Sequence, residues 1–316
     1  MRFNVMVEPQ EGASYSQLVD VARRAEELGF EGFFRSDHYS SVRGVSKLGS
    51  TDAWATLAGL ARDTARIRLG TLMSPITWRH PVVLAKTVTT VDEMSEGRIE
   101  LGIGTGWQPL EHQMYGFPFE DFKSRFAWLE ESLKIILALW TEDSATIKGK
   151  KFSIKDAEFL PKPLQKPHPP ILIGGVGQKK TPRLAARYAQ EWNATGLDPK
   201  TYAERRAQVL QECEKIGRDP SSIVCSLMTG VFVGRDQKDF EERASLASQQ
   251  LRGDPDWKPL YDALRTRWIV GPADEAAEKL AAYADAGCQR IMFQLHVLDD
   301  LDHLDVIWRD LRTRVI

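Results

Sequence analysis

The sequence predicts an α/β fold, a (β/α)8 barrel of the TIM type with insertions. Eight short apolar segments with strand character alternate with helical segments along the 316 residues. Strand–helix–strand units of this kind form parallel sheets with right-handed crossovers, and a single barrel spans about 200 to 400 residues. An open, doubly wound sheet is the alternative. The count of eight strands and the lack of an early G-x-G-x-x-G motif favour the barrel.

The first half of the chain contains four strand–helix units. Apolar residues recur at helical spacing from Tyr15 onward, and Gly29 ends that helix. Pro81 stands at the favoured first position of a later helix. The expected strands are 3–7, 33–34, 67–72 and 98–103, and the helices that follow them are 15–28, 51–61, 81–94 and 126–140.

The second half begins with an interruption of the alternation. A turn at 148–151 between two short apolar runs predicts a β-hairpin insertion at about 143–160. The remaining strands are expected at 171–173, 191–194, 224–233 and 291–295, and helices at 202–216, 240–251, 302–312 and from about 181 and 272. The segment 191–194 is short and polar, but it lies where a sixth strand is due. We find no linker or internal repeat and expect one domain over residues 1–316.

Composition excludes several classes of protein. The chain has 42 Lys plus Arg against 44 Asp plus Glu, a net charge of −2, which argues against a broad basic face for nucleic acid or acidic lipid. Its three cysteines, Cys213, Cys225 and Cys288, form neither a disulfide framework nor a CxxC site. No signal peptide or membrane-length apolar run is evident. We therefore expect a cytoplasmic globular protein without nucleic-acid or membrane partners.

The candidate chemistry lies in four loops that follow predicted strands, at 35–39, 71–75, 102–107 and 174–180. Ligand sites of parallel barrels lie at the carboxyl ends of the strands, so these loops are expected to share one rim. Asp37 and His38 are adjacent there. They suit an acid/base pair, because histidine titrates near neutrality and a carboxylate can orient it. A histidine held by local hydrogen bonds is the alternative.

Two glycine-rich segments suggest ligand contacts. Gly104-Thr105-Gly106-Trp107 permits close backbone approach to a flat ligand or to a neighbouring strand. The segment 174–177 precedes a helix and suits a phosphate, since glycines permit a nest of N–H groups at a helix start. Four basic residues follow this segment, namely Lys179, Lys180, Arg183 and Arg187. The alternative is that they belong to an ordinary solvated helix face. The six histidines include no HxH or HExxH, so no metal site is predicted.

Five motifs together resemble the bacterial luciferase-like superfamily of flavin- and deazaflavin-dependent oxidoreductases. They span more than half of the chain in the order of the family: F-R-S-D-H-Y at 34–39, G-T-L-M-S-P at 70–75, G-R-I-E-L-G-I-G-T-G-W at 97–107, E-H-x-x-Y-G at 111–116 and P-P-I-L-I-G-G at 169–175. The resemblance implies a luciferase-like (β/α)8 barrel with a planar ring at its mouth. The S-D-H segment is typical of the branch that uses the deazaflavin coenzyme F420.

The resemblance also implies roles for individual residues. Asp37 would contact the coenzyme, and His38 would lie near the reacting carbon. A non-prolyl cis peptide at Leu72–Met73, followed by Ser74, would support the ring. The other residues expected to bind the cofactor are Gly104, Thr105 and Gly106 at the ring and Gly174, Gly175, Val176, Gly177, Lys179 and Lys180 at the phosphate.

One position departs from the family pattern. Sugar-phosphate dehydrogenases of this branch carry an acidic residue directly after G-x-G-T-G, where this chain has Trp107. The nearest carboxylate is Glu111, and whether it can replace that acid stays open. Because of this departure, sugar-phosphate oxidation is less expected. Reduction of an activated double bond or of an imine is at least as plausible. The catalytic candidates are therefore His38, Trp107 and Glu111, with Tyr39, Trp107 and Tyr115 expected to shape the substrate pocket.

Three functions follow from these observations. The first is an F420-dependent oxidoreductase that moves hydride between the deazaflavin and a small organic substrate. The second is a monooxygenase that uses reduced FMN and oxygen, and the third is a non-redox barrel that binds a phosphorylated metabolite. A homodimer and a separate flavin or F420 reductase are the protein partners considered. Substrate specificity is expected in the segments 38–50, 107–125 and 250–270.

Overall fold

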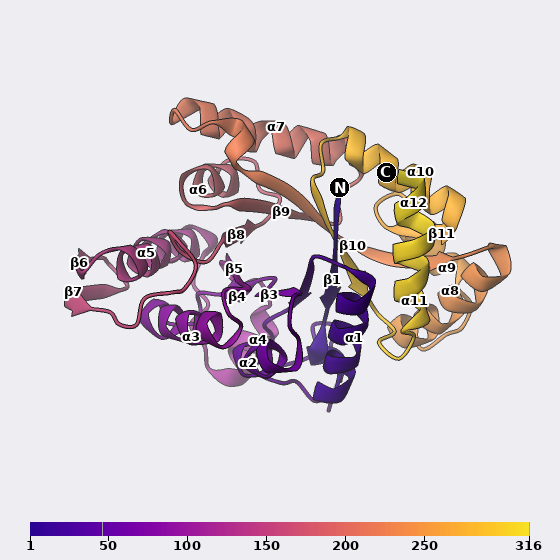
Figure 1. The fold of residues 1–316 in the computed structure, drawn as a ribbon, viewed down its shortest axis with the longest axis horizontal. Helices are drawn as coiled ribbons and strands as arrows, with labels where there is room; N and C mark the ends of the chain where they lie inside the picture. Colours follow the sequence, from indigo (N-terminus) through magenta and orange to yellow (C-terminus); the bar gives the residue numbers. More distant parts are fainter. Residues whose placement is uncertain (46, 316) are drawn as a thin grey trace.

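The computed structural model describes residues 1–45 and 47–315. Its eight main strands run parallel and close into a barrel, because β12 pairs with both β1 and β10, and β9 pairs with β8 and β10. Helices lie outside the strands (Figure 1). In barrel order the strands are β1 (Arg2–Val7), β2 (Gly32–Arg35), β3 (Arg68–Thr71), β5 (Ile99–Gly104), β8 (Ile171–Gly174), β9 (Glu191–Thr195), β10 (Val224–Gly234) and β12 (Arg290–Leu295).

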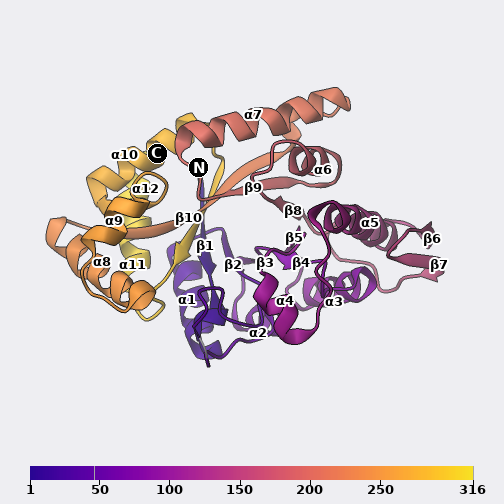
Figure 2. The same ribbon diagram turned by 180° about the vertical axis from the view of Figure 1, so that it is seen from behind.

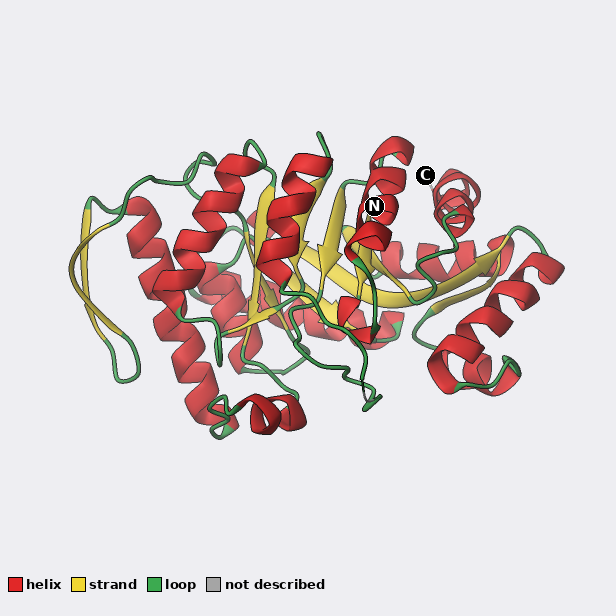
Figure 3. Ribbon diagram, turned by 90° about the horizontal axis from the view of Figure 1, so that it is seen from below, coloured by secondary structure: helices red, strands yellow, loops and turns green. Residues whose placement is uncertain are grey.

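The predicted barrel is therefore confirmed, and all eight expected strands occur within a few residues of their expected limits. The third strand ends at Thr71 because the chain turns at the Leu72–Met73 peptide, which is cis as expected. It resumes as β4 (Ser74–Pro75), which pairs with β5. The expected hairpin forms from β6 (Ser144–Lys148) and β7 (Ser153–Glu158), which pair antiparallel and project at one side of the molecule (Figure 3).

The first helix shows how the sequence sets the limits of an element. Helix α1 (Tyr15–Leu28) starts at Ser14, whose side chain accepts from the N–H of Gln17 while Gln17 reciprocates, a capping box. It ends at Gly29, whose φ of 98° favours glycine. The other predicted helices are α2 (Ala53–Asp63), α3 (Pro81–Met94), α5 (Phe122–Thr141), α6 (Lys180–Tyr188), α7 (Pro199–Lys215), α8 (Gln237–Arg252) and α10 (Ala273–Asp285).

Several elements differ from the prediction. Two helices were not expected, α4 (Pro109–Tyr115) and α9 (Lys258–Leu264). A further strand, β11 (Ile269–Pro272), pairs with the second half of β10, so Pro272 ends a strand and α10 begins one residue later. The single helix expected at 302–312 is instead α11 (Asp302–Asp305), a π-helical segment (Val306–Leu311) and α12 (Arg312–Val315). Short 3₁₀ turns occur at Pro9–Glu11 and Pro220–Ser222.

These differences have physical reasons. Helix α4 is short and leaves Leu110 and Met114 exposed, so it has no buried apolar stripe that sequence periodicity could reveal. Strand β11 contributes only four residues outside the closed barrel. Figure 2 shows α4 on the side of the molecule that faces the viewer. Within the described part of the chain, no helix combines the length and the apolar character needed to cross a membrane.

A buried ion network closes the barrel end at which the strands begin. Arg290 Nη1 lies 2.7 Å from Glu100 Oε2 and 2.8 Å from Glu191 Oε2, and Glu100 also pairs with Arg68. Burial raises the pKa of the Glu100 carboxyl, but the attraction of Arg290 and Arg68 outweighs burial and holds that pKa below its ordinary value. An apolar layer lies above the network, formed by Met6, Phe34, Leu72, Leu172 and Met292. The opposite end of the barrel is left for ligands.

We expect Arg290→Met to lower the free energy of unfolding by about 3–5 kcal/mol, because the buried Glu191 would lose the cation it pairs with and Glu100 would keep only Arg68. Urea denaturation measures the change. Arg2→Met is the matched control, since Arg2 pairs with Glu31 at 2.7 Å but its side chain is 47% exposed, and its loss should stay below about 1 kcal/mol. Equal losses in the two variants would show that the network is not a structural requirement.

Candidate active site

The structure brings the predicted catalytic residues together at the mouth of the barrel. His38 follows β2, Trp107 follows β5, and Glu111 lies in the first turn of α4. The ring of Trp107 meets that of His38 edge-on, with 5.8 Å between the ring centroids. Tyr115, at the end of α4, donates its hydroxyl to the backbone oxygen of Tyr39 at 3.0 Å. Two loops and one helix therefore form this side of the mouth.

His38 and Glu111 form a directly bonded pair. His38 Nδ1 lies 2.7 Å from Glu111 Oε2, and the Glu111 side chain is fully buried. The other Glu111 oxygen accepts from the backbone N–H groups of Tyr39 and Ser40. An ionised carboxylate only accepts hydrogen bonds, so a neutral His38 carries its proton on Nδ1. Its Nε2, for which we find no hydrogen bond among the described residues, is then the nitrogen left for a reacting group.

The carboxylate beside the histidine thus comes from α4 and not from position 107. Trp107 is 59% exposed and places an aromatic edge, with no carboxylate, next to His38. Glu111 is far from His38 in sequence, and Pro109 at the first helical positions starts the helix that carries it. The arrangement can hold a proton on Nδ1 of the imidazole.

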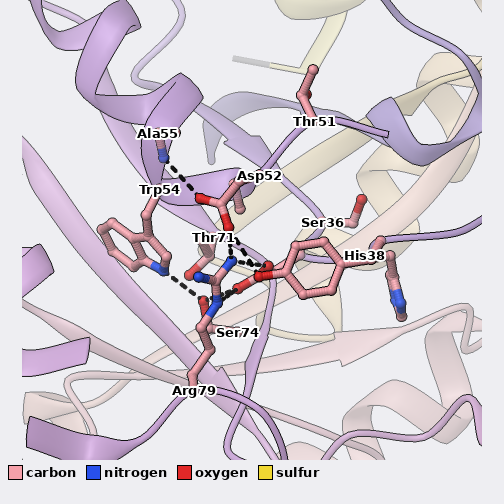
Figure 4. A network of polar contacts seen from close by, with 12 residues as sticks. Ser36, His38, Thr51, Asp52, Trp54, Ala55, Thr71, Ser74 and Arg79 are labelled. Carbon is pink, nitrogen blue, oxygen red and sulfur yellow. Dashed lines mark hydrogen bonds and ion pairs between the residues drawn. The ribbon is translucent and has the colours of Figure 1, made fainter. Parts of the chain in front are cut away.

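Asp37 belongs to a second network, whose members Ser74, Arg79, Asp52 and Trp54 are labelled in Figure 4. Its buried carboxylate accepts from Ser74 Oγ at 2.7 Å and from Arg79 Nε and Nη2 at 3.0 and 2.7 Å. The polar atoms of Asp37 and Ser74 are therefore bonded within the protein, although the resemblance implied contact with the coenzyme. Ser74 also accepts from the indole N–H of Trp54 at 2.9 Å. The network holds the loops after β2 and β3 in fixed positions.

Arg79 extends this network to α2 and was not predicted. Its Nη2 lies 2.6 Å from Asp52 Oδ2, which also accepts from the Tyr39 hydroxyl at 3.0 Å. Burial lowers the pKa of the Arg79 guanidinium, but its bonds to Asp37 and Asp52 outweigh burial and raise the pKa, so Arg79 stays charged. Arg79 follows the G-T-L-M-S-P motif by four residues. Only this proximity hinted at its place in the site.

Glycines at the ends of β5 and β8 face the segment Thr71–Met73. A Cβ on Gly174 would lie 2.8 Å from Met73 Cε, and one on Gly102 would lie 2.0 Å from the Thr71 oxygen. A Cβ on Gly104 would lie 3.5 Å from Met73 Cβ, an ordinary contact. Bare backbone at Gly102 and Gly174 lets Met73, after the cis peptide, lie at the mouth between the ends of β5 and β8. A smooth wall results, which fits the face of a planar ring.

The predicted phosphate loop leads into α6. Gly175 has a φ of 137°, and no side chain caps the first turn of α6, so its N–H groups stay available for an anion. Val176 and Lys179 are exposed beside them. Lys180 differs, because its ammonium lies 5.2 Å from the centroid of the Phe126 ring. Lys179 is thus the lysine better placed for a ligand at this loop.

Two further residues at the mouth were missed. Glu8 follows β1 and His296 follows β12, and both line a cavity of about 110 Å³. Burial, together with the charge of Glu11, raises the pKa of Glu8. Burial lowers the pKa of His296 to about 3, so the ring is neutral, and it stacks on Trp268 with 5.0 Å between the centroids. The rule that sites follow strand ends would have found both residues.

The described residues fit an organic cofactor. No group of three or more His, Cys, Asp or Glu side chains in residues 1–45 and 47–315 is arranged to hold a metal ion. The mouth offers the smooth wall at Met73 and the uncapped start of α6. The imidazole of His38 meets the ring of Trp107 edge-on and is bonded through Nδ1 to the buried Glu111. These features suit a planar ring with an anionic extension.

Comparison with known proteins agrees with the motifs. The model of the luciferase-like monooxygenase family matches residues 1–290. The F420-dependent glucose-6-phosphate dehydrogenase of Segniliparus rotundus is 30% identical over 320 residues, which cover 95% of this chain and 93% of that protein.

Solved structures share the fold. An F420-dependent secondary alcohol dehydrogenase in complex with an F420-acetone adduct has a TM-score of 0.85 at 20% identity, covering 100% of this chain and 99% of the other. The monooxygenase RslO1 from Streptomyces bottropensis has a TM-score of 0.86 at 20% identity and covers 100% of both chains. The predicted family is confirmed: the chain belongs to the luciferase-like monooxygenase family.

Proposed function

We propose that this protein is an F420-dependent oxidoreductase that transfers hydride between the deazaflavin coenzyme and a small organic substrate. The observation that carries the proposal is His38, held by the buried Glu111 beside the smooth wall at Met73, in a barrel of this family. Relatives named as F420-dependent dehydrogenases support the choice of coenzyme.

The residues that would hold the coenzyme lie on two sides of the mouth. Met73 and the bare backbone of Gly104 would support the ring, with Thr105 and Gly106 beside it. The loop 174–177, the start of α6 and Lys179 would receive its phosphate. When bound, the deazaflavin supplies a two-electron hydride carrier, and the protein supplies orientation and exclusion of water.

His38 would handle the proton that accompanies the hydride. Its Nε2 can accept or donate a proton at the substrate, while Glu111 keeps the other nitrogen protonated and stabilises the imidazolium. Trp107, Tyr39 and Tyr115 would shape the substrate side of the mouth. A general acid–base contribution of this kind amounts to about 10²–10⁴ in rate.

An FMN-dependent monooxygenase is the second candidate. The close similarity in fold to the monooxygenase RslO1 favours it, and the smooth wall at Met73 would also accept a flavin. The third function considered, a non-redox barrel, has no comparable observation in its favour. We further propose that the protein acts in the cytoplasm as one domain, as a homodimer, and receives its reduced cofactor from a separate flavin or F420 reductase.

Titration of the purified protein with each cofactor distinguishes the candidates. We expect F420 to bind with a dissociation constant on the order of micromolar, or about −8 kcal/mol, followed by quenching of deazaflavin fluorescence, and turnover without oxygen consumption. FMN should bind at least about tenfold more weakly. Micromolar binding of FMN with none of the deazaflavin would refute the F420 proposal and favour the monooxygenase.

Substitution of the histidine pair tests the proton step. We expect His38→Gln to lower kcat by about 10²–10⁴-fold with little change in cofactor affinity. Glu111→Gln should lower kcat by about tenfold or more, because an amide can donate to Nδ1 and reverse the tautomer of His38. Steady-state kinetics and fluorescence titration measure the two effects separately.

Tyr188→Phe is the control for this pair, since it removes a hydroxyl bond to Glu130 and leaves the contacts of His38 and Glu111 in place. Its kcat should stay within about threefold of the parent, well short of the 10²–10⁴ range of general acid–base catalysis. If His38→Gln retains the parent kcat, the proton must be handled by another group.

A further inference from the structure

Glu8 and His296 lie side by side at the mouth of the barrel. Strands β1 and β12 pair in register at Val7 and Leu295, so Glu8 and His296 are the next residues on the two strands. Side chains alternate between the two faces of a strand. The earlier inward-facing residues belong to the buried ion network or to the apolar layer above it: Asn4, Met6, Arg290 and Met292. Glu8 and His296 continue this alternation, and both line a cavity of about 110 Å³.

The Nε2 atom of His296 is buried and has no hydrogen-bond partner among the described residues. Burial, together with the charges of Arg43 and His303, lowers the pKa of His296 to about 3, so the ring is neutral. A neutral imidazole carries its proton on one of its two nitrogens, so Nε2 can donate a hydrogen bond. A buried polar atom without a partner is costly. This nitrogen therefore calls for a polar group of a ligand.

Glu8 supplies a second donor to the same cavity. Burial and the charge of Glu11 raise the pKa of the Glu8 carboxyl. The side chain of Gln294 and the charges of His38 and Arg43 act in the opposite direction, but the pKa stays raised. These groups face Glu8 from the turn after β1, from β12 and from the loop after β2. A protonated carboxyl carries an O–H donor, which a carboxylate lacks.

The cavity suits an uncharged oxygen better than a phosphate or a carboxylate. Arg43 is the one cation among the described lining residues, and its Nε lies 2.8 Å from Glu11 Oε2. Asp299 adds another carboxylate to the lining. An anionic group would thus meet like charges without a free cation, which is costly. Two neutral donors, by contrast, can share the two lone pairs of one carbonyl oxygen.

The cavity lies across the barrel from the wall at Met73. In barrel order β12 and β1 are opposite β5 and β8, whose ends flank Met73. His38 follows β2, the strand beside β1. A substrate between this wall and the cavity can therefore present its oxygen to Glu8 and His296. A carbon of the substrate then faces the ring site, with His38 to one side.

We propose that Glu8 and His296 form a site for the carbonyl oxygen of an uncharged, conjugated carbonyl substrate, such as an enone. This inference rests on the proposed function and names its substrate class. We call the pair the carbonyl site.

The proposed reaction uses two separate groups of the protein. The carbon–carbon double bond of the substrate accepts hydride at one carbon, and its π electrons move toward the oxygen. There the Glu8 O–H and the His296 Nε2–H stabilise the negative charge, as neutral donors can in a buried site. Protonated His38 gives its Nε2 proton to the neighbouring carbon and is reprotonated from water. A simple ketone would instead need its proton at the oxygen, so separate stations fit conjugate reduction.

The test uses cyclohex-2-enone as the neutral probe, with reduced F420 as the hydride source. We expect its double bond to be reduced and the cyclohexanone formed to remain a ketone. Crotonate, an anionic conjugated probe, should react at least about tenfold more slowly. Glu8→Leu should lower kcat for the enone by about 10²–10³-fold, the usual cost of one donor to a developing oxyanion. Its affinity for F420, measured by fluorescence titration, should match the parent.

Glu8→Gln gives a readout that a purely structural role would not change. Its amide N–H can still donate, so kcat should fall by about tenfold or less. The parent loses the O–H of Glu8 as well as the proton of His38 as pH rises. The alkaline limb of log kcat against pH should therefore have a limiting slope of about −2 in the parent and about −1 in Glu8→Gln. Infrared difference spectra without cofactor should show a protonated carboxyl that Glu8→Gln lacks.

Glu278→Gln is the matched control, because Glu278 is exposed on α10 and does not line the cavity. It should keep the parent rate and the parent pH profile. Three results overturn the carbonyl site while F420 binding stays intact. They are an unchanged rate in Glu8→Leu, no protonated carboxyl assigned to Glu8, and turnover of cyclohexanone or crotonate in place of the enone. Failure of the parent to bind F420 refutes the proposed function itself.

Discussion

The ion pairs of Arg79 with Asp37 and Asp52 hold together the segments on which the candidate site is built. Asp37 lies in the loop after β2, Arg79 in the segment after β4, and Asp52 caps α2. His38 and Tyr39 directly follow Asp37, so their positions depend on this contact. Buried charges of this kind are stable only as a set, since removal of one leaves another unpaired. His38, the proposed catalytic residue, thus follows a network in which its own side chain takes no part.

The barrel could be predicted from the sequence because each strand and each helix has its own pattern of apolar residues, which can be recognised without knowledge of the contacts between segments. It missed α4, whose Leu110 and Met114 face solvent, and β11, which joins only the end of β10. The loops of the site were predicted from their place after strands. The pairing of His38 with Glu111 was not predicted, because contacts across 73 residues depend on the folded chain.

Trp107 stands where sugar-phosphate dehydrogenases of the F420 branch carry an acidic residue, and in this chain the carboxylate next to His38 comes from Glu111. An acidic residue at that position would come from the end of β5, whereas Glu111 comes from a helix one turn further along. The carboxylate of Glu111 is bonded to His38, and position 107 carries an exposed indole beside the imidazole. In the proposed function, proton handling and substrate contact therefore fall to separate residues, so a substitution at Trp107 leaves the bond between His38 and Glu111 in place.

The division of β10 affects how the rim of the barrel can move. Residues 224–230 of this strand pair with β9 and β12 inside the barrel, whereas residues 231–234 pair only with β11. The outer part packs on its own apolar cluster, which includes Phe232, Phe240 and Val270. Local unfolding follows such boundaries between cooperative units. The boundary lies between Gly230 and Val231, so the pairing of β10 with β9 and β12 does not depend on the outer part that carries β11.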